Sequence, residues 1–224
     1  MLAENIAHVE EKIERACARA GRRRADVTLV AVTKKFPASA IVEAYGLGLR
    51  DFGENYLQEF EAKAPEVAGL PSARFHFIGH LQANKTRKAA ELFHVIETVD
   101  SVRIARRLNE ACIDLAKTPL DVYLEVKLSD EEAKAGAAPE ELAELVAAAR
   151  ACEHLHLRGL MTMPPWSEEP EASRPYFKRL AALATEHGLT GLSMGMSNDF
   201  ETAIEEGSTL IRVGTALFGK RPKA

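Results

Sequence analysis

The feature that most constrains the fold of this chain is a regular alternation of strand-like and helix-like stretches. Short runs rich in β-branched and aromatic residues alternate with segments in which apolar residues recur at helical spacing. The predicted strands are Val27–Thr33, Arg50–Gly53, Arg74–Ile78, His94–Thr98, Asp121–Lys127, His156–Thr162, Gly191–Met194 and Leu210–Val213. The predicted helices between them are Ala38–Tyr45, Tyr56–Ala64, Gln82–Leu92, Val102–Ala116, Pro139–Cys152, Ser173–Glu186 and Asp199–Glu205.

Eight such units in 224 residues favour a closed (β/α)8 TIM barrel, because parallel strands need a crossover helix between them. An open, doubly wound sheet shares the alternation and is the competing architecture. The absence of a glycine-rich dinucleotide turn after the first strand favours the barrel. We expect residues 1–224 to form a single α/β barrel domain. An extra N-terminal helix that ends at Gly21 is predicted by apolar residues at helical spacing: Leu2, Ile6, Val9, Ile13, Ala16 and Ala20.

Composition and charge restrict the class of protein. The net charge is −4 and the only basic run is Arg22–Arg24, which argues against a nucleic-acid partner. The three cysteines are widely spaced and show no metal-ligand pattern, which is typical of a reduced, cytoplasmic protein. No apolar run is long enough to cross a bilayer, and charged residues near the N-terminus replace the apolar core of a signal peptide. We therefore expect no membrane partner.

The first predicted strand ends in a lysine. Strand alternation places Val30, Val32 and Lys34 on one face. If this face lines the barrel, the Lys34 amine stands at the barrel mouth above apolar side chains. Partial desolvation there lowers the pKa of the amine and suits it to Schiff-base chemistry with an aldehyde. The alternative is that a lysine at a strand end simply reaches water.

Polar and glycine residues follow the strands at the ends where TIM barrels carry their active sites. Two places favour a phosphate: Ser197 and Asn198 after the seventh strand, and Gly214 and Thr215 after the eighth. Exposed backbone N–H groups at the start of a helix favour an anion there, whereas the alternative for Ser197 or Asn198 is plain helix capping. The other residues that follow the strands are Glu54, Asn55, Gly79, His80, Gln82, Asp100, Ser101, Ser129, Lys134, Gly136, Met163 and Pro164.

Other side chains near these strand ends leave two interpretations open. Strand alternation turns Arg212 inward, either as a structural ion pair with a barrel acid such as Glu125 or as a ligand contact. Among the histidines, His76 is expected to be structural, and only His80 is placed to touch a ligand. No zinc-ligand spacing accompanies them. Trp166 either covers the site as a flap or packs on the surface.

Six short motifs give the chain a resemblance to a known family. They occur in order along nearly the whole chain: AVTK at 31–34, FGEN at 52–55, HFIGHLQ at 76–82, GLMTM at 159–163, LSMGMS at 192–197 and RVGT at 212–215. In these motifs the sequence resembles the YggS/PROSC family of pyridoxal phosphate homeostasis proteins.

The resemblance implies a barrel of the alanine-racemase N-terminal type that binds pyridoxal 5′-phosphate (PLP) as an internal aldimine on Lys34. It implies phosphate contacts from Ser197, Gly214 and Thr215, and a contact between Arg212 and the ring nitrogen. An arginine at that nitrogen keeps it unprotonated, which weakens PLP as an electron sink. The implied cofactor-binding residues are Lys34, Asn55, His80, Met196, Ser197, Arg212, Gly214 and Thr215; no catalytic residue and no metal site are expected.

The sequence departs from the family pattern at three positions. Thr33 stands where the family usually has serine, which is a tolerable exchange of hydroxyls. Lys35 adjoins Lys34 and competes for the aldehyde, but strand alternation and motif register both select Lys34. Lys127 stands where relatives often have asparagine, so the resemblance does not define the contacts on that side of the site.

Racemase-like relatives carry a second domain that supplies an acid/base group, and this chain is expected to end shortly after the eighth strand. We therefore expect a PLP carrier or buffer in intracellular vitamin B6 homeostasis, without efficient catalysis. Apoenzymes that receive PLP are the expected partners, and the chain is expected to be a monomer or weak dimer. One alternative is a PLP-dependent racemase or lyase whose missing group comes from a partner subunit. Another is a Schiff-base aldolase acting on a phosphosugar.

Overall fold

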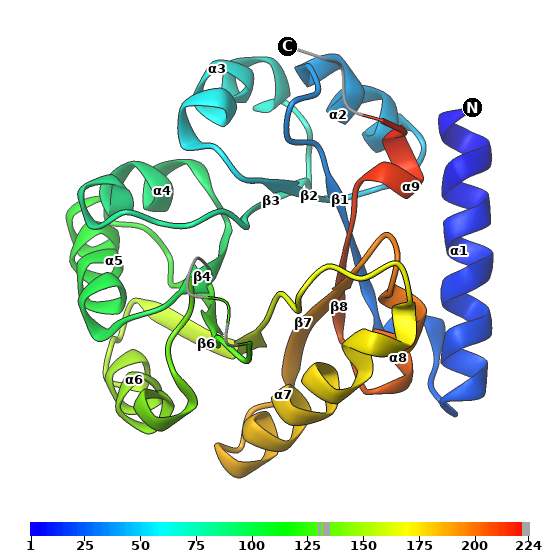
Figure 1. Ribbon diagram of the computed structural model, residues 1–224. Helices are drawn as coiled ribbons and strands as arrows, with labels where there is room; N and C mark the ends of the chain where they lie inside the picture. The colour runs from blue at the N-terminus through cyan, green and yellow to red at the C-terminus, as the bar shows by residue number, and fades with distance from the viewer. Residues whose placement is uncertain (130, 132–134, 221–224) are drawn as a thin grey trace.

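Eight parallel strands close into a barrel in sequence order, with helices around the outside (Figure 1). The computed structural model describes residues 1–129, 131 and 135–220, so Lys134 lies outside the described residues. Strand β1 pairs in parallel with both β2 and β8, and this closure excludes the open doubly wound sheet. The strands are β1 (Thr28–Val32), β2 (Asp51–Glu54), β3 (Arg74–Phe77), β4 (Val95–Val99), β5 (Leu120–Glu125), β6 (Leu155–Met161), β7 (Gly191–Met196) and β8 (Leu210–Val213).

The helices confirm the predicted alternation and add one short element. They are α1 (Leu2–Arg19), α2 (Ala38–Gly46), α3 (Leu57–Val67), α4 (Thr86–Leu92), α5 (Val102–Asp114), α6 (Leu142–Arg150), α7 (Arg174–Glu186), α8 (Phe200–Glu205) and α9 (Thr215–Phe218). 3₁₀ turns at Ala83–Lys85, Pro139–Glu141 and Pro170–Ser173 precede α4, α6 and α7, so that α4 and α6 begin later than predicted whereas α7 begins within one residue of its predicted start. Helix α9 was not predicted, because four residues are too short to show a helical repeat.

Strand alternation separates the barrel interior from the layer beneath the helices. In β1, Leu29 and Ala31 belong to the apolar core under the helices, whereas Val30 and Val32 point inward. A Cβ atom at Gly53 of β2 would lie 3.0 Å from side-chain atoms of both Val30 and Ile78. The interior is therefore filled, and a side chain at position 53 would displace its neighbours.

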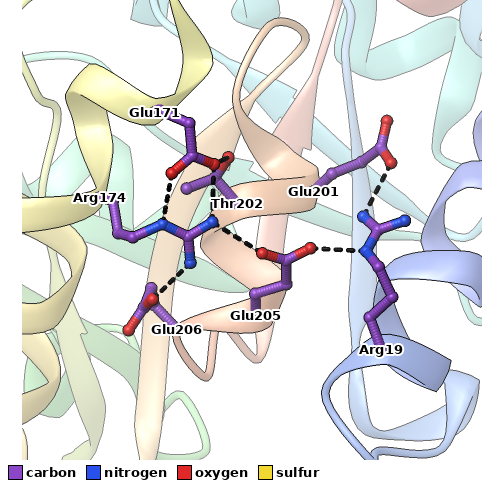
Figure 2. Close-up of polar contacts among 7 residues, drawn as sticks. All are labelled: Arg19, Glu171, Arg174, Glu201, Thr202, Glu205 and Glu206. Carbon is purple, nitrogen blue, oxygen red and sulfur yellow. Dashed lines mark hydrogen bonds and ion pairs between the residues drawn. The ribbon is translucent and has the colours of Figure 1, made fainter.

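Helix α1 lies outside the barrel beside α8 and α9 (Figure 1). Figure 2 shows the ion pairs that join it to α8: Arg19 Nε lies 2.7 Å from Glu205 and its Nη2 lies 3.1 Å from Glu201. Glu205 also accepts from Arg174 of α7 at 2.8 Å, and Arg174 pairs with Glu206 at 2.5 Å. This surface network links the N-terminal helix to the helices on either side of β7.

Candidate functional site

A cavity of about 290 Å³ lies where the carboxyl ends of the strands meet. Its walls combine apolar side chains, such as Val32 and Ile78, with a few polar groups, which is typical of a small-molecule site. Seven of the eight predicted cofactor-binding residues line it: Lys34, Asn55, Met196, Ser197, Arg212, Gly214 and Thr215. Residues distant in the sequence are therefore brought together as the strand-end argument predicts.

The turn after β1 distinguishes the two adjacent lysines. The Phe36 amide donates to the Thr33 carbonyl at 3.0 Å, which closes a tight turn around Lys34 and Lys35. Lys35 has φ +65°, an uncommon conformation for a residue with a side chain, and is exposed. Lys34 is half-buried and lines the cavity. The register inferred from strand alternation therefore agrees with the structure.

Behind this turn lies a buried cluster that the sequence did not reveal. Lys63 Nζ of α3 donates to Glu54 Oε1 at 2.8 Å, to Glu59 Oε1 at 2.6 Å and to the Thr33 carbonyl at 3.1 Å. The Thr33 hydroxyl also donates to Glu54 at 2.7 Å, and the Lys35 amide donates to Glu59 at 2.5 Å. Burial raises the pKa of Glu54, although the Lys63 charge opposes the shift. The cluster fixes the backbone on both sides of Lys34.

The turns after β7 and β8 meet at a serine hydroxyl. Ser197 Oγ accepts from the Gly214 amide at 3.1 Å and from the Ala216 amide at 3.3 Å. Two backbone N–H groups therefore converge on one oxygen, as they do around a bound phosphate oxygen. A hydroxyl that accepts two hydrogen bonds still has its own proton to donate. This arrangement is suited to an anion at the wall formed by Gly214 and Thr215.

The alternative that Ser197 or Asn198 only caps the following helix is wrong. Helix α8 begins after Asp199, which makes no side-chain cap. The Asn198 amide instead donates to the Ser167 carbonyl at 2.9 Å, in the loop before α7. Asp199 accepts from the Met196 amide at 2.7 Å. Ser197, Asn198 and Asp199 therefore stabilise the loops around the cavity.

Arg212 of β8 points into the barrel, as predicted, and is buried. Its Nη2 donates to the Thr162 carbonyl at 2.9 Å, and its Nη1 donates to Ser193 Oγ. Its acidic neighbour is Glu97 of β4, with Nη1 3.7 Å from Oε2, in place of the expected Glu125. Burial lowers the pKa of Arg212, and the charge of Glu97 opposes that shift. Arg212 is thus both a member of a structural network and a wall of the cavity.

His80 lies in a second cavity of about 560 Å³ next to the first. The two cavities share Met163, Trp166 and Met196 as walls. The His80 side chain is 59% exposed, with Nδ1 3.5 Å from Asp100. The structure therefore places His80 beside the cavity of Lys34 and not among the residues that line it.

Two further residues of the second cavity have distinctive surroundings. Glu125 of β5 is buried, and its Oε2 has no hydrogen-bond partner among the residues the structure describes. Burial raises the pKa of Glu125 to about 7, and the charge of Asp100 adds to the shift. Lys127 lines the same cavity. Trp166 is 75% exposed and borders both cavities, so it stands at the rim of the site.

Within residues 1–129, 131 and 135–220, no group of three or more histidine, cysteine, aspartate or glutamate side chains could hold a metal ion. Over the same residues, no helix is both long and apolar enough to cross a bilayer. Cys17, Cys112 and Cys152 are free and buried.

Comparison with known proteins adds an independent finding. The alanine racemase N-terminal domain family matches residues 5–222. A pyridoxal phosphate homeostasis protein of Pseudomonas aeruginosa is 49% identical over 98% of this chain and 96% of its own length. The chain belongs to the pyridoxal phosphate homeostasis protein family. The Escherichia coli member is 44% identical over 98% of this chain and 97% of its own length.

Solved structures show the same fold for this family. PipY of Synechococcus elongatus is 38% identical and covers 98% of this chain, and all of its own chain is matched. Its structure without PLP aligns with a TM-score of 0.88, and its PLP-bound structure with 0.84. Alanine racemase of Corynebacterium glutamicum is 19% identical with a TM-score of 0.69, and 62% of its chain is covered. That likeness concerns the barrel fold alone.

Proposed function

We propose that this protein binds PLP in the cavity of Lys34 and acts in intracellular PLP homeostasis as a carrier or buffer. The observation that carries the proposal is the meeting of Lys34, the Ser197–Gly214 contact and Arg212 in one cavity. Relatives that align over nearly the whole chain are named pyridoxal phosphate homeostasis proteins, and the PipY structure contains PLP. We infer that the barrel of residues 1–224 is one PLP-binding domain.

The polar groups of the cavity fit the chemistry of PLP. The Ser197 and Thr215 hydroxyls suit its phosphate, and the Gly214 and Ala216 amides hold the Ser197 oxygen in place. Asn55 Oδ1 is buried and has no hydrogen-bond partner among the described residues, so it is available to a hydroxyl donor. Arg212 supplies an N–H donor for a ring nitrogen. PLP supplies an aldehyde that reacts with an amine, and Lys34 is the cavity lysine that we propose carries it.

We propose that efficient proton transfer is not part of this function. Apart from Lys34 and Arg212, the titratable side chain among the described cavity residues is Asp199. Asp199 is engaged by the Met196 amide and by the Ser173 hydroxyl at 2.7 Å. An arginine at the ring nitrogen also disfavours carbanion chemistry, because it does not protonate the ring. Holding and releasing PLP therefore suits this cavity better than turnover.

The cellular setting follows from the same role. We propose that apoenzymes which need PLP receive it from this protein, with the exposed Trp166 at the rim of the exit. The free thiols support a reducing, cytoplasmic compartment. A monomer or weak dimer suits a carrier whose cavity must remain accessible.

Titration with PLP tests the proposal. The wild-type protein is expected to develop the visible absorbance band of lysine-bound PLP at one equivalent. Lys34→Ala should lose the band, and Lys35→Ala is the matched control that should keep it. Loss of the band in Lys35→Ala alone, or a colourless wild-type protein, would contradict the assignment. Trapping of a phosphosugar by a colourless protein would support the aldolase alternative.

A weak PLP-dependent racemase or lyase activity is the second candidate, and one observation favours it. Glu125 is buried beside the cavity of Lys34 with its pKa raised to about 7, near the value required of a general acid or base. If this activity exists, Glu125→Gln should abolish it while PLP binding persists. Sustained racemisation by the wild-type protein that depends on Lys34 would overturn the carrier proposal.

A further inference from the structure

A line of hydrogen-bonded side chains crosses the barrel interior and ends at Arg212. Asp51 Oδ1 lies 2.9 Å from His76 Nε2, and His76 Nδ1 lies 2.7 Å from Glu97 Oε1. The Ser193 hydroxyl donates to Glu97 Oε2 at 2.6 Å and accepts from Arg212 Nη1. Asp51 borders a polar cavity of about 300 Å³ at the other end of the barrel, opposite the candidate site. The five residues therefore connect the two ends of the barrel interior.

The charges along this line alternate. Burial opposes the charge on His76, but its hydrogen bonds with Asp51 and Glu97 outweigh burial and raise its pKa. Burial likewise opposes the charge on Glu97, but its contacts with His76, Arg212 and Ser193 outweigh it and lower its pKa. In order, the line consists of two acids on either side of a histidine, then a serine hydroxyl and an arginine. Each charged side chain in it lies next to a side chain of opposite charge. Such pairing is required for ionised groups inside a barrel.

The line also fixes the direction of the Arg212 side chain. Its Nη1 is anchored on Ser193 of β7 and its Nη2 on the Thr162 carbonyl after β6. A planar guanidinium bound through two of its nitrogens cannot rotate without breaking a contact. Ser193 is the pivot, because its single hydroxyl contacts both Glu97 and Arg212. Loss of Ser193 removes both of these hydrogen bonds and leaves only the 3.7 Å ion pair between Arg212 and Glu97, with every charge in place.

We propose that Glu97, His76 and Ser193 are positioning residues that hold Arg212 against the ring nitrogen of bound PLP. None of the three lines the cavity of Lys34, so they act only through Arg212. The inference rests on the proposed PLP function. The residues that determine PLP binding would then include side chains at the centre of the barrel as well as those of the cavity wall.

An analogue test isolates the ring nitrogen. The affinity of the protein for PLP is compared with its affinity for 1-deaza-PLP, in which carbon replaces that nitrogen. A hydrogen bond from a charged donor is worth about tenfold in affinity, so the wild-type protein should favour PLP by about that factor. Ser193→Ala and Glu97→Gln should reduce this preference severalfold, mainly through weaker binding of PLP. A general loss of packing would instead weaken the binding of both ligands equally.

Ser208→Ala is the matched control. Ser208 is a buried serine between β7 and β8 whose hydroxyl donates to the Met194 carbonyl at 2.7 Å, away from Arg212. It should leave the preference for PLP unchanged. If Glu97→Gln fails to fold, Ser193→Ala decides the question, because it removes no charge. An unchanged preference in folded Ser193→Ala would overturn the inference, as would a wild-type protein that binds both ligands equally. A wild-type protein that binds neither ligand contradicts the proposed function itself.

Discussion

Two buried glutamates on neighbouring strands, Glu97 of β4 and Glu125 of β5, have opposite electrostatic environments. Both are almost completely shielded from solvent. Both Glu97 oxygens accept hydrogen bonds, and its pKa is lowered. Glu125 Oε2 has no hydrogen-bond partner in the described part of the chain, and burial raises its pKa to about 7. Partners, and not depth alone, decide whether a buried carboxyl is charged.

The difference divides the barrel interior into two functional regions. The region around β3, β4, β7 and β8 satisfies its charges internally and orients Arg212. In the region around β5, Glu125 Oε2 lacks a hydrogen-bond partner among the described residues, and Glu125 lines the second cavity together with the rim residue Trp166. We expect the first region to be rigid and intolerant of substitution. We expect the second to contain the carboxyl, Glu125, whose protonation changes near neutral pH.

The largest expected effect is that of Glu97→Gln on stability. The substitution removes the carboxylate that faces both His76 and Arg212, so that His76 keeps only Asp51 and Arg212 loses its ion pair; breaking a buried pair in this way costs about 3–5 kcal/mol. His76 is able to lose its proton, which relieves part of that cost. Urea unfolding at neutral pH measures the change in the free energy of unfolding. A loss below about 1 kcal/mol would show that the line through the barrel is not charged.

Glu125→Gln is expected to have the opposite effect, and only at high pH. The unfolded carboxyl titrates near 4.5 and the folded one near 7, so the folded state holds an extra proton between these values. The stability of the wild-type protein therefore falls by about 3 kcal/mol as the pH rises through this window. The variant lacks this penalty, so unfolding at pH 5 and pH 8 should show it relatively more stable at pH 8. Equal stability differences at the two pH values would contradict the raised pKa.

The smallest expected effect is that of Arg19→Ala in the surface network of Figure 2. Arg19 is about half exposed, and ion pairs of this kind contribute about 0–1 kcal/mol each. The loss should shrink further in high salt, because exposed charges are screened. Thermal unfolding in low and high salt measures this. If Arg19→Ala lowered the stability as much as Glu97→Gln does, and equally at low and high salt, the expected difference between buried and surface ion pairs would be contradicted.

The sequence predicted the barrel well because its main signal is local. Alternating apolar residues, such as Leu29 and Ala31 against Val30 and Val32, identify strands whose two faces are both covered. The same alternation selected Lys34 over Lys35, and the structure places Lys34 in the cavity. Strand-end positions brought Ser197 and Gly214 together, because parallel strands carry their loops to one end.

The remaining features depend on contacts between distant residues. The choice of Glu97 over Glu125 as the neighbour of Arg212 depends on strand order across the barrel, which periodicity does not encode. His80 lies in the second cavity, a placement that depends on the path of the loop after β3. Lys63 had a detectable signal, since it occupies the buried face of α3 together with Leu57, Phe60 and Val67. A lysine on an apolar face implies a buried acidic partner, although not which one.

The most direct test of the account is to identify the residue that carries PLP. The protein is incubated with PLP, reduced with borohydride and digested, and the modified peptide is located by mass spectrometry. We expect a single adduct on the Lys34 amine that is absent from Lys34→Ala. An adduct on Lys35, on Lys63 or on another lysine would contradict it.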